Sequence, residues 1–371
     1  MKILVSVSPG EMRVAAWDGE ALADYALWRP GRPDGVGDLH RGRVIARLPA
    51  MAGSFVALAG AEGFLPDSEA PALPGAGQIV GVRVTRAAQG GKGPRLTARL
   101  SDAEQHAAAA AAGVGLVGRG PGAVERLAAR FADAPVVIDD AGLVAELRPA
   151  LGARLRHGTA FDDAVESAAA ALADSTAALP GGARLSVHPT PALTALDVDL
   201  AGASAERRGK TASQEAANRA LLPALARQIR LRNLGGAIVV DLAGMSARRR
   251  AVLGPAFAAA LATDPLQPRF LGFSALGLAE ILRPRIHPPL HELLAGPHAA
   301  GLAALRQAAA DIHANPGRAL ALHATPAIVT ALRADPAAMA ALAHRAGRPL
   351  ILVTQAPAGL PDWTLKDIPR G

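Results

Sequence analysis

Cysteine is absent from this chain of 371 residues, and that absence excludes several kinds of chemistry. Disulfides, thiolate zinc sites, iron–sulfur clusters and a cysteine nucleophile all need a thiol. A chain without thiols fits a reducing compartment. No apolar run reaches the ~20 residues that a membrane-spanning helix needs, and the start of the chain lacks the pattern of a signal peptide. The sequence therefore predicts a cytoplasmic protein.

Lysine and aromatic residues are also scarce. Only four of the 39 basic residues are lysines, and the chain has seven Phe, three Trp and one Tyr. With 32 acidic residues the net charge is +7, and the pI is near 10.7. The codon bias of a GC-rich genome explains this arginine excess as well as a polyanionic partner does. Charge alone therefore leaves both interpretations open.

Hydrophobic residues make up 50% of the chain, so it can bury a sizeable core and is not disordered. At about 100–200 residues per domain it has room for two or three domains. Residues 1–30 predict β-structure. Short, closely spaced strands between residues 41 and 100 predict a small barrel of the OB type, which commonly binds single-stranded nucleic acid.

Strand-like and helical segments alternate from residue 135 onward, which is typical of α/β architecture. In the middle of the chain we expect strands over 192–200 and 237–242. Helices are expected over 213–231, 246–262 and 275–282.

Acidic residues interrupt the two predicted central strands. Asp197 and Asp199 lie two residues apart in one apolar run, so their side chains share a face of the strand, and Asp241 ends the second run. Buried acids are costly unless they bind a cation or make strong hydrogen bonds. If the two strands are neighbours, the three carboxylates form an oxygen-ligand site suited to Mg²⁺. The alternative is that an aspartate at a strand end caps the following turn.

Two of the few phenylalanines fall in the predicted barrel, at Phe55 and Phe64, and Lys92 lies in a glycine-rich loop there. Aromatic rings stack with bases and a lysine meets phosphate, which indicates a single-stranded nucleic-acid surface. A packed barrel core is the alternative for the two rings.

Three histidines come closest to a zinc-binding motif in the sequence: His287, His291 and His298. Pro288 and Pro289 separate the first two, so they do not share one helical face. With no cysteine nearby, the sequence does not favour zinc.

Several segments resemble the ribonuclease E/G family. Residues 226–241 read ARQIRLRNLGGAIVVD and resemble the family signature, while residues 193–199 resemble its metal-binding strand and 271–280 a further block. The barrel resembles the family's OB-fold domain through residues 42–44, 54–56, 63–66 and 91–93. The likeness follows nearly the whole chain in order.

The resemblance implies a mixed α/β (α+β) multidomain architecture. An OB-fold RNA-binding barrel would be inserted in a ribonuclease H-like domain, followed by a deoxyribonuclease I-like catalytic domain and a small C-terminal α/β domain. The implied boundaries are 1–33 with 134–182 for the ribonuclease H-like domain, 34–102 for the barrel, 103–133 for a shortened 5′-sensor-like segment, 183–296 for the catalytic domain and 297–371 for the C-terminal domain.

The resemblance also implies an endoribonuclease that hydrolyses phosphodiester bonds of single-stranded RNA with Mg²⁺. The family's metal-binding aspartates fall on Asp197 and Asp241, with Asp199 beside them as a third catalytic residue. Its RNA-gripping residues fall on Phe55, Phe64 and Lys92. The arginine that recognises an RNA 5′-monophosphate falls on Arg119.

Two positions and one segment depart from the family pattern. Asp199 stands where the family usually has Asn, and Gly120 stands where it has Thr beside the sensor arginine. Residues 296–301 contain no thiol where the family has Cys-x-x-Cys. We therefore expect no zinc and no zinc-linked tetramer, although a homodimer is still compatible with the chain. A non-catalytic RNA-binding protein on the same scaffold is the alternative to an enzyme.

Overall fold

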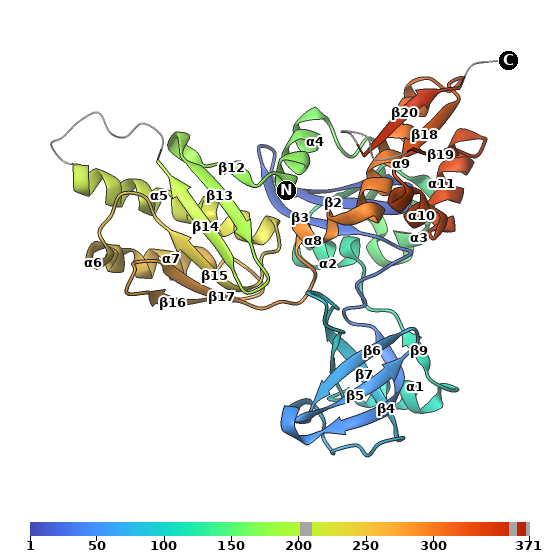
Figure 1. Cartoon of the computed structure of the whole chain (residues 1–371), viewed down its shortest axis with the longest axis horizontal. Coiled ribbons are helices and arrows are strands. Elements are labelled where there is room, and N and C mark those ends of the chain that lie inside the picture. Colours follow the sequence, from blue (N-terminus) through green and yellow to red (C-terminus); the bar gives the residue numbers. More distant parts are fainter. Residues whose placement is uncertain (201–209, 356–361, 369–371) are drawn as a thin grey trace. The chain divides into compact units, whose positions relative to one another are not determined.

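The computed structural model describes residues 1–200, 210–355 and 362–368 (Figure 1). The chain divides into two compact units. The first comprises residues 1–33, 122–173 and 290–371, and the second comprises residues 34–121 and 174–289. Within the described residues, no helix combines the length and apolar character needed to cross a membrane.

A five-stranded sheet begins the first unit, in the order β11-β10-β1-β2-β3. Its strands are β1 (Lys2–Ser8), β2 (Glu11–Trp17), β3 (Leu22–Trp28), β10 (Val136–Ile138) and β11 (Leu155–His157). Strands β1, β10 and β11 run parallel, and β1 to β3 form an antiparallel meander. The helices next to the sheet are α2 (Ala123–Arg130), α3 (Ala141–Leu151) and α4 (Asp163–Ala170).

The rest of the first unit is a small α/β layer. A three-stranded sheet, β19-β18-β20, packs with helices through a core that includes Leu305, Leu322 and Leu332. The elements are α8 (Leu290–Leu293), α9 (Gly296–Ala314), β18 (Leu320–Ala324), α10 (Pro326–Arg333), α11 (Pro336–Ala346), β19 (Ile351–Thr354) and β20 (Trp363–Asp367).

The second unit contains a closed, OB-like barrel of five strands, as the sequence predicts. The ring runs β5-β6-β8-β7-β4 and closes because β4 also pairs with β5. Strand β9 adds to the outside of β4. The elements are β4 (Leu39–Leu48), β5 (Gly53–Leu58), β6 (Ala61–Pro66), β7 (Ile79–Arg86), β8 (Arg95–Thr97), α1 (Asp102–Ala110) and β9 (Gly115–Gly118).

A six-stranded sheet forms the other part of this unit, in the order β12-β13-β14-β15-β17-β16. The elements are β12 (Thr176–Ala178), β13 (Arg184–Pro189), β14 (Thr194–Asp199), α5 (Lys210–Leu231), β15 (Gly236–Asp241), α6 (Ala247–Arg250), α7 (Gly254–Leu261), β16 (Arg269–Phe273) and β17 (Ala279–Arg283). Side chains such as Leu196, Ile229 and Val240 form one core between the sheet and helices α5 and α7.

Two expected helices differ from the structure. Residues 275–282 form a turn followed by strand β17, because Ala279 and Ile281 are buried while Glu280 and Leu282 are more exposed, an alternation with period two. The segment 246–262 is divided into α6, a short 3₁₀ turn and α7. Pro255 lacks an N–H group, so it is tolerated only in the first turn of the second helix.

Candidate functional site

Asp197 and Asp241 lie directly side by side on neighbouring parallel strands. In the register of β14 and β15 the two residues are partners, and such strands are about 4.8 Å apart. Leu196, Val198 and Val240 point into the core, so the alternation of the strands places both aspartates on the opposite, exposed face. The structure thus brings together the two carboxylates that the sequence placed 44 positions apart.

Asp199 lies on the same exposed face as this pair. It is two residues further along β14, about 6.6 Å from Asp197 along the strand, and its register partner on β13 is Arg184. Within the described residues, no group of three His, Cys, Asp or Glu side chains is arranged to hold a metal ion. The candidate is therefore an open pair of carboxylates, and Mg²⁺ commonly takes one or two carboxylates and fills its other positions with water and substrate phosphate.

Arg250 is a residue that the sequence analysis missed. Its Nη1 donates to Asp241 Oδ1 at 2.7 Å, and its other donors reach the carbonyl oxygens of Leu242, Met245 and Gly277. Only 9% of Arg250 is exposed, whereas the Asp241 side chain is 52% exposed. A fixed arginine thus orients a carboxylate that still faces solvent. The only signal in the sequence was an arginine run, Arg248–Arg250, shortly after the acid.

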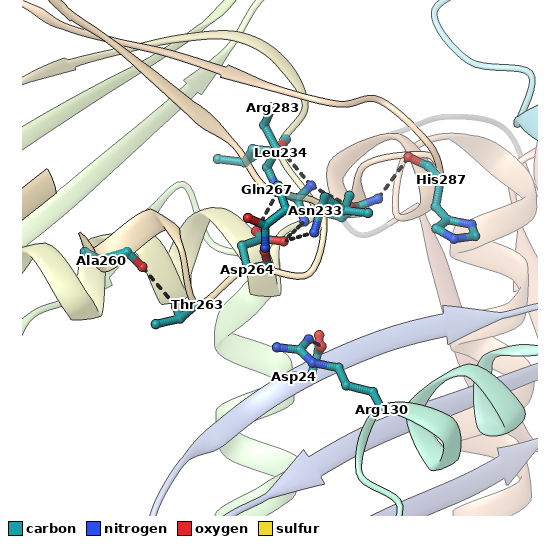
Figure 2. A network of polar contacts seen from close by, with 11 residues as sticks. Asp24, Arg130, Asn233, Leu234, Ala260, Thr263, Asp264, Gln267, Arg283 and His287 are labelled. Carbon is teal, nitrogen blue, oxygen red and sulfur yellow. Dashed lines mark hydrogen bonds and ion pairs between the residues drawn. The ribbon is translucent and has the colours of Figure 1, made fainter. Parts of the chain in front are cut away.

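The turn between α5 and β15 is held by a polar network that centres on Asn233, Asp264 and Arg283 (Figure 2). Asn233 adopts a left-handed conformation with φ 47°, and its Nδ2 donates to the carbonyl oxygens of His287 and Pro288. Arg283 donates from Nη1 to Asn233 Oδ1 and from Nε to Asp264 Oδ2, both at 2.8 Å. These contacts fix the beginning of β15, the strand that ends at Asp241.

The Arg283–Asp264 pair at the centre of this network is almost completely buried, with 3% and 2% of the side chains exposed. Arg283 also donates to the carbonyl oxygen of Leu234. Well-placed hydrogen bonds of this kind are what make a buried ion pair tolerable. The segment that resembles a family signature is therefore largely structural, and only its last residue reaches the exposed carboxylate pair.

Phe55 and Phe64 form a ring pair on the barrel. They are register partners on β5 and β6, and their ring centroids are 5.7 Å apart at an interplanar angle of 68°. Their neighbours Val56 and Leu65 belong to the barrel core, so alternation places both rings on the outer face, where they are half-buried. Gly53 gives the Phe64 ring its space, since a Cβ there would lie 2.3 Å from the ring. This arrangement favours a stacking surface over the packed-core alternative.

Lys92 is exposed in the tight turn that joins β7 to β8. Gln89 and Lys92 pair across the turn, and Gly90 and Gly91 both have positive φ. Side chains other than glycine rarely adopt this conformation. The turn therefore places the exposed lysine directly beside its glycine tip.

Arg119, the predicted sensor residue, has an acidic partner within the protein. Its Nη1 donates to Asp38 Oδ2 at 2.6 Å, and the backbone N–H of Gly120 donates to Asp38 Oδ1 at 2.8 Å. Asp38 is 5% exposed and the Arg119 side chain 59% exposed. The Asp38 carboxylate thus already accepts a hydrogen bond from Arg119, the residue that the resemblance assigns to binding a phosphate.

The three histidines are not brought to one place within a unit. His287 belongs to the second unit and contacts Asp34 through Nδ1 at 2.6 Å. His291 and His298 belong to the first unit, where His298 Nε2 contacts Asp335 at 2.9 Å. Separate local contacts thus explain His287 and His298.

The second unit thus combines a closed OB-like barrel with a sheet that presents paired aspartates on an exposed face. A sequence model of the Ribonuclease E/G family matches residues 153–286, the region that holds these aspartates and the signature. Over residues 153–286 the chain is thus similar to the ribonuclease E/G family, as the sequence predicts.

Individual relatives agree with this assignment. Over 120 residues the chain is 32% identical to ribonuclease E of Synechocystis sp., covering 32% of this chain and 18% of that protein. Over 402 aligned positions it is 25% identical to ribonuclease G of Escherichia coli K12, covering 79% of this chain and 81% of the relative. Ribonuclease G of Shigella flexneri matches to the same extent. The chain thus spans less than a fifth of the ribonuclease E that it matches, but most of the ribonuclease G.

Proposed function

We propose that the protein is an endoribonuclease that cleaves single-stranded RNA by Mg²⁺-assisted hydrolysis of a phosphodiester. The observation that carries the proposal is the register pairing of Asp197 with Asp241 on an exposed sheet face, in a region similar to the ribonuclease E/G family. Two adjacent carboxylates repel each other, which is unfavourable unless a cation balances them. Arg250 balances only Asp241.

The donor set fits Mg²⁺, which prefers hard oxygen ligands and keeps open positions for water and phosphate. Asp197 and Asp241 would hold the ion, which when bound neutralises charge on a phosphodiester and activates water. Arg250 keeps the Asp241 carboxylate in one orientation through its bond to Oδ1. Asp199, on the same face, would accept a hydrogen bond from the attacking water.

The barrel would hold the RNA strand. Phe55 and Phe64 offer ring faces and edges on its outer surface, and Lys92 offers a positive charge in the turn that joins β7 to β8. Every base has a π-face, so such a surface accepts many sequences. In the same proposal Arg119 recognises the RNA 5′ end.

The decisive experiment incubates the full chain with a labelled single-stranded RNA in Mg²⁺ and, separately, in EDTA. We expect internal cleavage in Mg²⁺ and none after chelation, since the carboxylate pair has no activity without its cation. Cleavage that continues unchanged in EDTA would contradict the role of the aspartates.

A non-catalytic RNA-binding protein is the second candidate. Two observations favour it: Asp241 is already engaged by Arg250, and Arg119 by Asp38. Binding of RNA without any cleavage, in the presence of Mg²⁺, would select this alternative.

Replacing Phe64 by Ala is expected to weaken binding of single-stranded RNA by about 5- to 150-fold, the equivalent of ~1–3 kcal/mol for one stacked base. Affinity is measured in EDTA so that the RNA stays intact. Phe64→Trp is the matched control and should retain binding, because it keeps an aromatic surface. An Ala variant with unchanged affinity would place the ring outside the RNA-binding surface.

The proposal extends to the finer architecture. The barrel would interrupt a ribonuclease H-like domain, and the sheet that carries Asp197 and Asp241 would belong to a deoxyribonuclease I-like domain. The domain boundaries given above remain predictions. A homodimer without a zinc link is compatible with this proposal.

A further inference from the structure

Three arginines gather at one end of the barrel, in the second unit. Arg86 ends β7, Arg95 begins β8, and Arg285 lies in the segment that follows β17. Burial and the positive charges of Arg95 and Arg285 lower the pKa of Arg86. In the part of the chain that the structure describes, no carboxylate forms an ion pair with any of the three. The three positive charges therefore repel one another, and no carboxylate among the described residues compensates for this repulsion.

Two buried donors in this region have no acceptor. Arg86 Nε and Gln89 Nε2 are shielded from solvent, and neither has a hydrogen-bond partner among the described residues. Nearly all buried polar groups in folded proteins are paired, so an unpaired one calls for an explanation such as an absent ion. Both of these groups are donors, and the missing partner is therefore an acceptor.

The position of Arg285 is set by the glycine pair in the signature. Its Nε donates to the carbonyl oxygen of Gly235 at 3.2 Å, and a Cβ at Gly236 would lie 2.3 Å from Nε. The next residue, Ile286, accepts a hydrogen bond from the backbone N–H of Ala87 at 2.8 Å. The backbone on both sides thus holds Arg285 next to Arg86, so the cluster is built into the fold.

The cluster adjoins the aromatic pair of the barrel. Arg95 is the register partner of Phe64 on neighbouring parallel strands. Lys92 lies three positions before Arg95 in the same connection. An RNA strand whose base stacks on Phe64 therefore has its backbone within reach of these cations.

We propose that Arg86, Arg95 and Arg285 form a phosphate-binding site that holds the backbone of the RNA strand beside Phe64. The inference rests on the proposed function, because it needs RNA on the barrel. Phosphate oxygens accept hydrogen bonds from guanidinium groups in a bidentate manner, and their charge relieves the repulsion among the three side chains.

The test measures RNA affinity of the full chain in EDTA over a series of salt concentrations. Each phosphate contact contributes about 0.7 to the slope of log affinity against log salt for a single strand. We expect Arg95→Gln to weaken binding several-fold and to reduce that slope by ~0.7. Arg285→Gln should do the same, and Arg95→Lys should retain the slope because it retains the charge.

Arg156→Gln is the matched control. Arg156 is exposed on β11 in the first unit and has the same charge, so its loss should leave affinity and slope unchanged. If the unmodified chain binds RNA but Arg95→Gln binds equally well with the same slope, the phosphate site is refuted and the proposed function stands. If the unmodified chain does not bind RNA, both fail.

Discussion

Replacing Asp241 by Asn is expected to reduce the rate of Mg²⁺-dependent RNA cleavage by more than about 100-fold. Loss of a residue that only supports a metal ligand typically reduces activity by about 10- to 100-fold, so a larger effect indicates a ligand. Asn keeps the size of the side chain and an oxygen for the Arg250 hydrogen bond, but it removes the charge that attracts the cation. Cleavage of a labelled single-stranded RNA in Mg²⁺ measures the effect, and RNA binding in EDTA should be unchanged.

Asp133→Asn is the control for charge, since Asp133 is exposed in the first unit, and it should cleave normally. Arg250 loses its charged partner in Asp241→Asn, so thermal unfolding must show that the variant is folded. Asp197→Asn provides an independent check, because Asp197 is exposed and lies in register with Asp241. Full activity in both Asn variants would refute the catalytic pair.

Replacing Asp264 by Ala is expected to lower the free energy of unfolding by ~3–5 kcal/mol, because it leaves the buried guanidinium of Arg283 without its countercharge. The loss should be concentrated around β15 and β17, which Arg283 connects. Urea unfolding followed by circular dichroism measures the total change. Hydrogen exchange of peptides covering residues 236–241 and 279–283 shows where it occurs.

Asp67→Ala is the matched control for this prediction. Asp67 pairs with Arg47 at 3.8 Å, and both side chains are partly exposed, so the expected loss is at most ~1 kcal/mol. The double variant Asp264→Leu with Arg283→Met should recover part of the stability, since an apolar pair needs no charge balance. Equal losses of unfolding free energy for Asp264→Ala and Asp67→Ala would show that the buried pair stabilises the fold no more than the exposed pair does.

The shared face of Asp197 and Asp199 was predictable from the sequence because strands have a simple side-chain period. Leu196 and Val198 alternate with Asp197 and Asp199, so the acids had to share the face opposite the core. The barrel followed from short strands separated by glycine-rich turns. The expected helix over 275–282 was wrong, because a short apolar segment fits the side-chain period of a helix as well as that of a strand. Pairing with β15 decided in favour of a strand.

By itself the sequence determined the resemblance to the ribonuclease E/G family, the presence of an OB-like barrel and which acids share a strand face, since these depend on local order along the chain. Only the tertiary structure decided that Asp197 and Asp241 are partners in register, that Arg250 orients one of them and that Asp264 balances Arg283. The same is true of the gathering of Arg86, Arg95 and Arg285 at the end of the barrel. Such contacts join residues from separate strands and loops. The periodicity of a sequence does not encode which charged residues, far apart along the chain, come into contact.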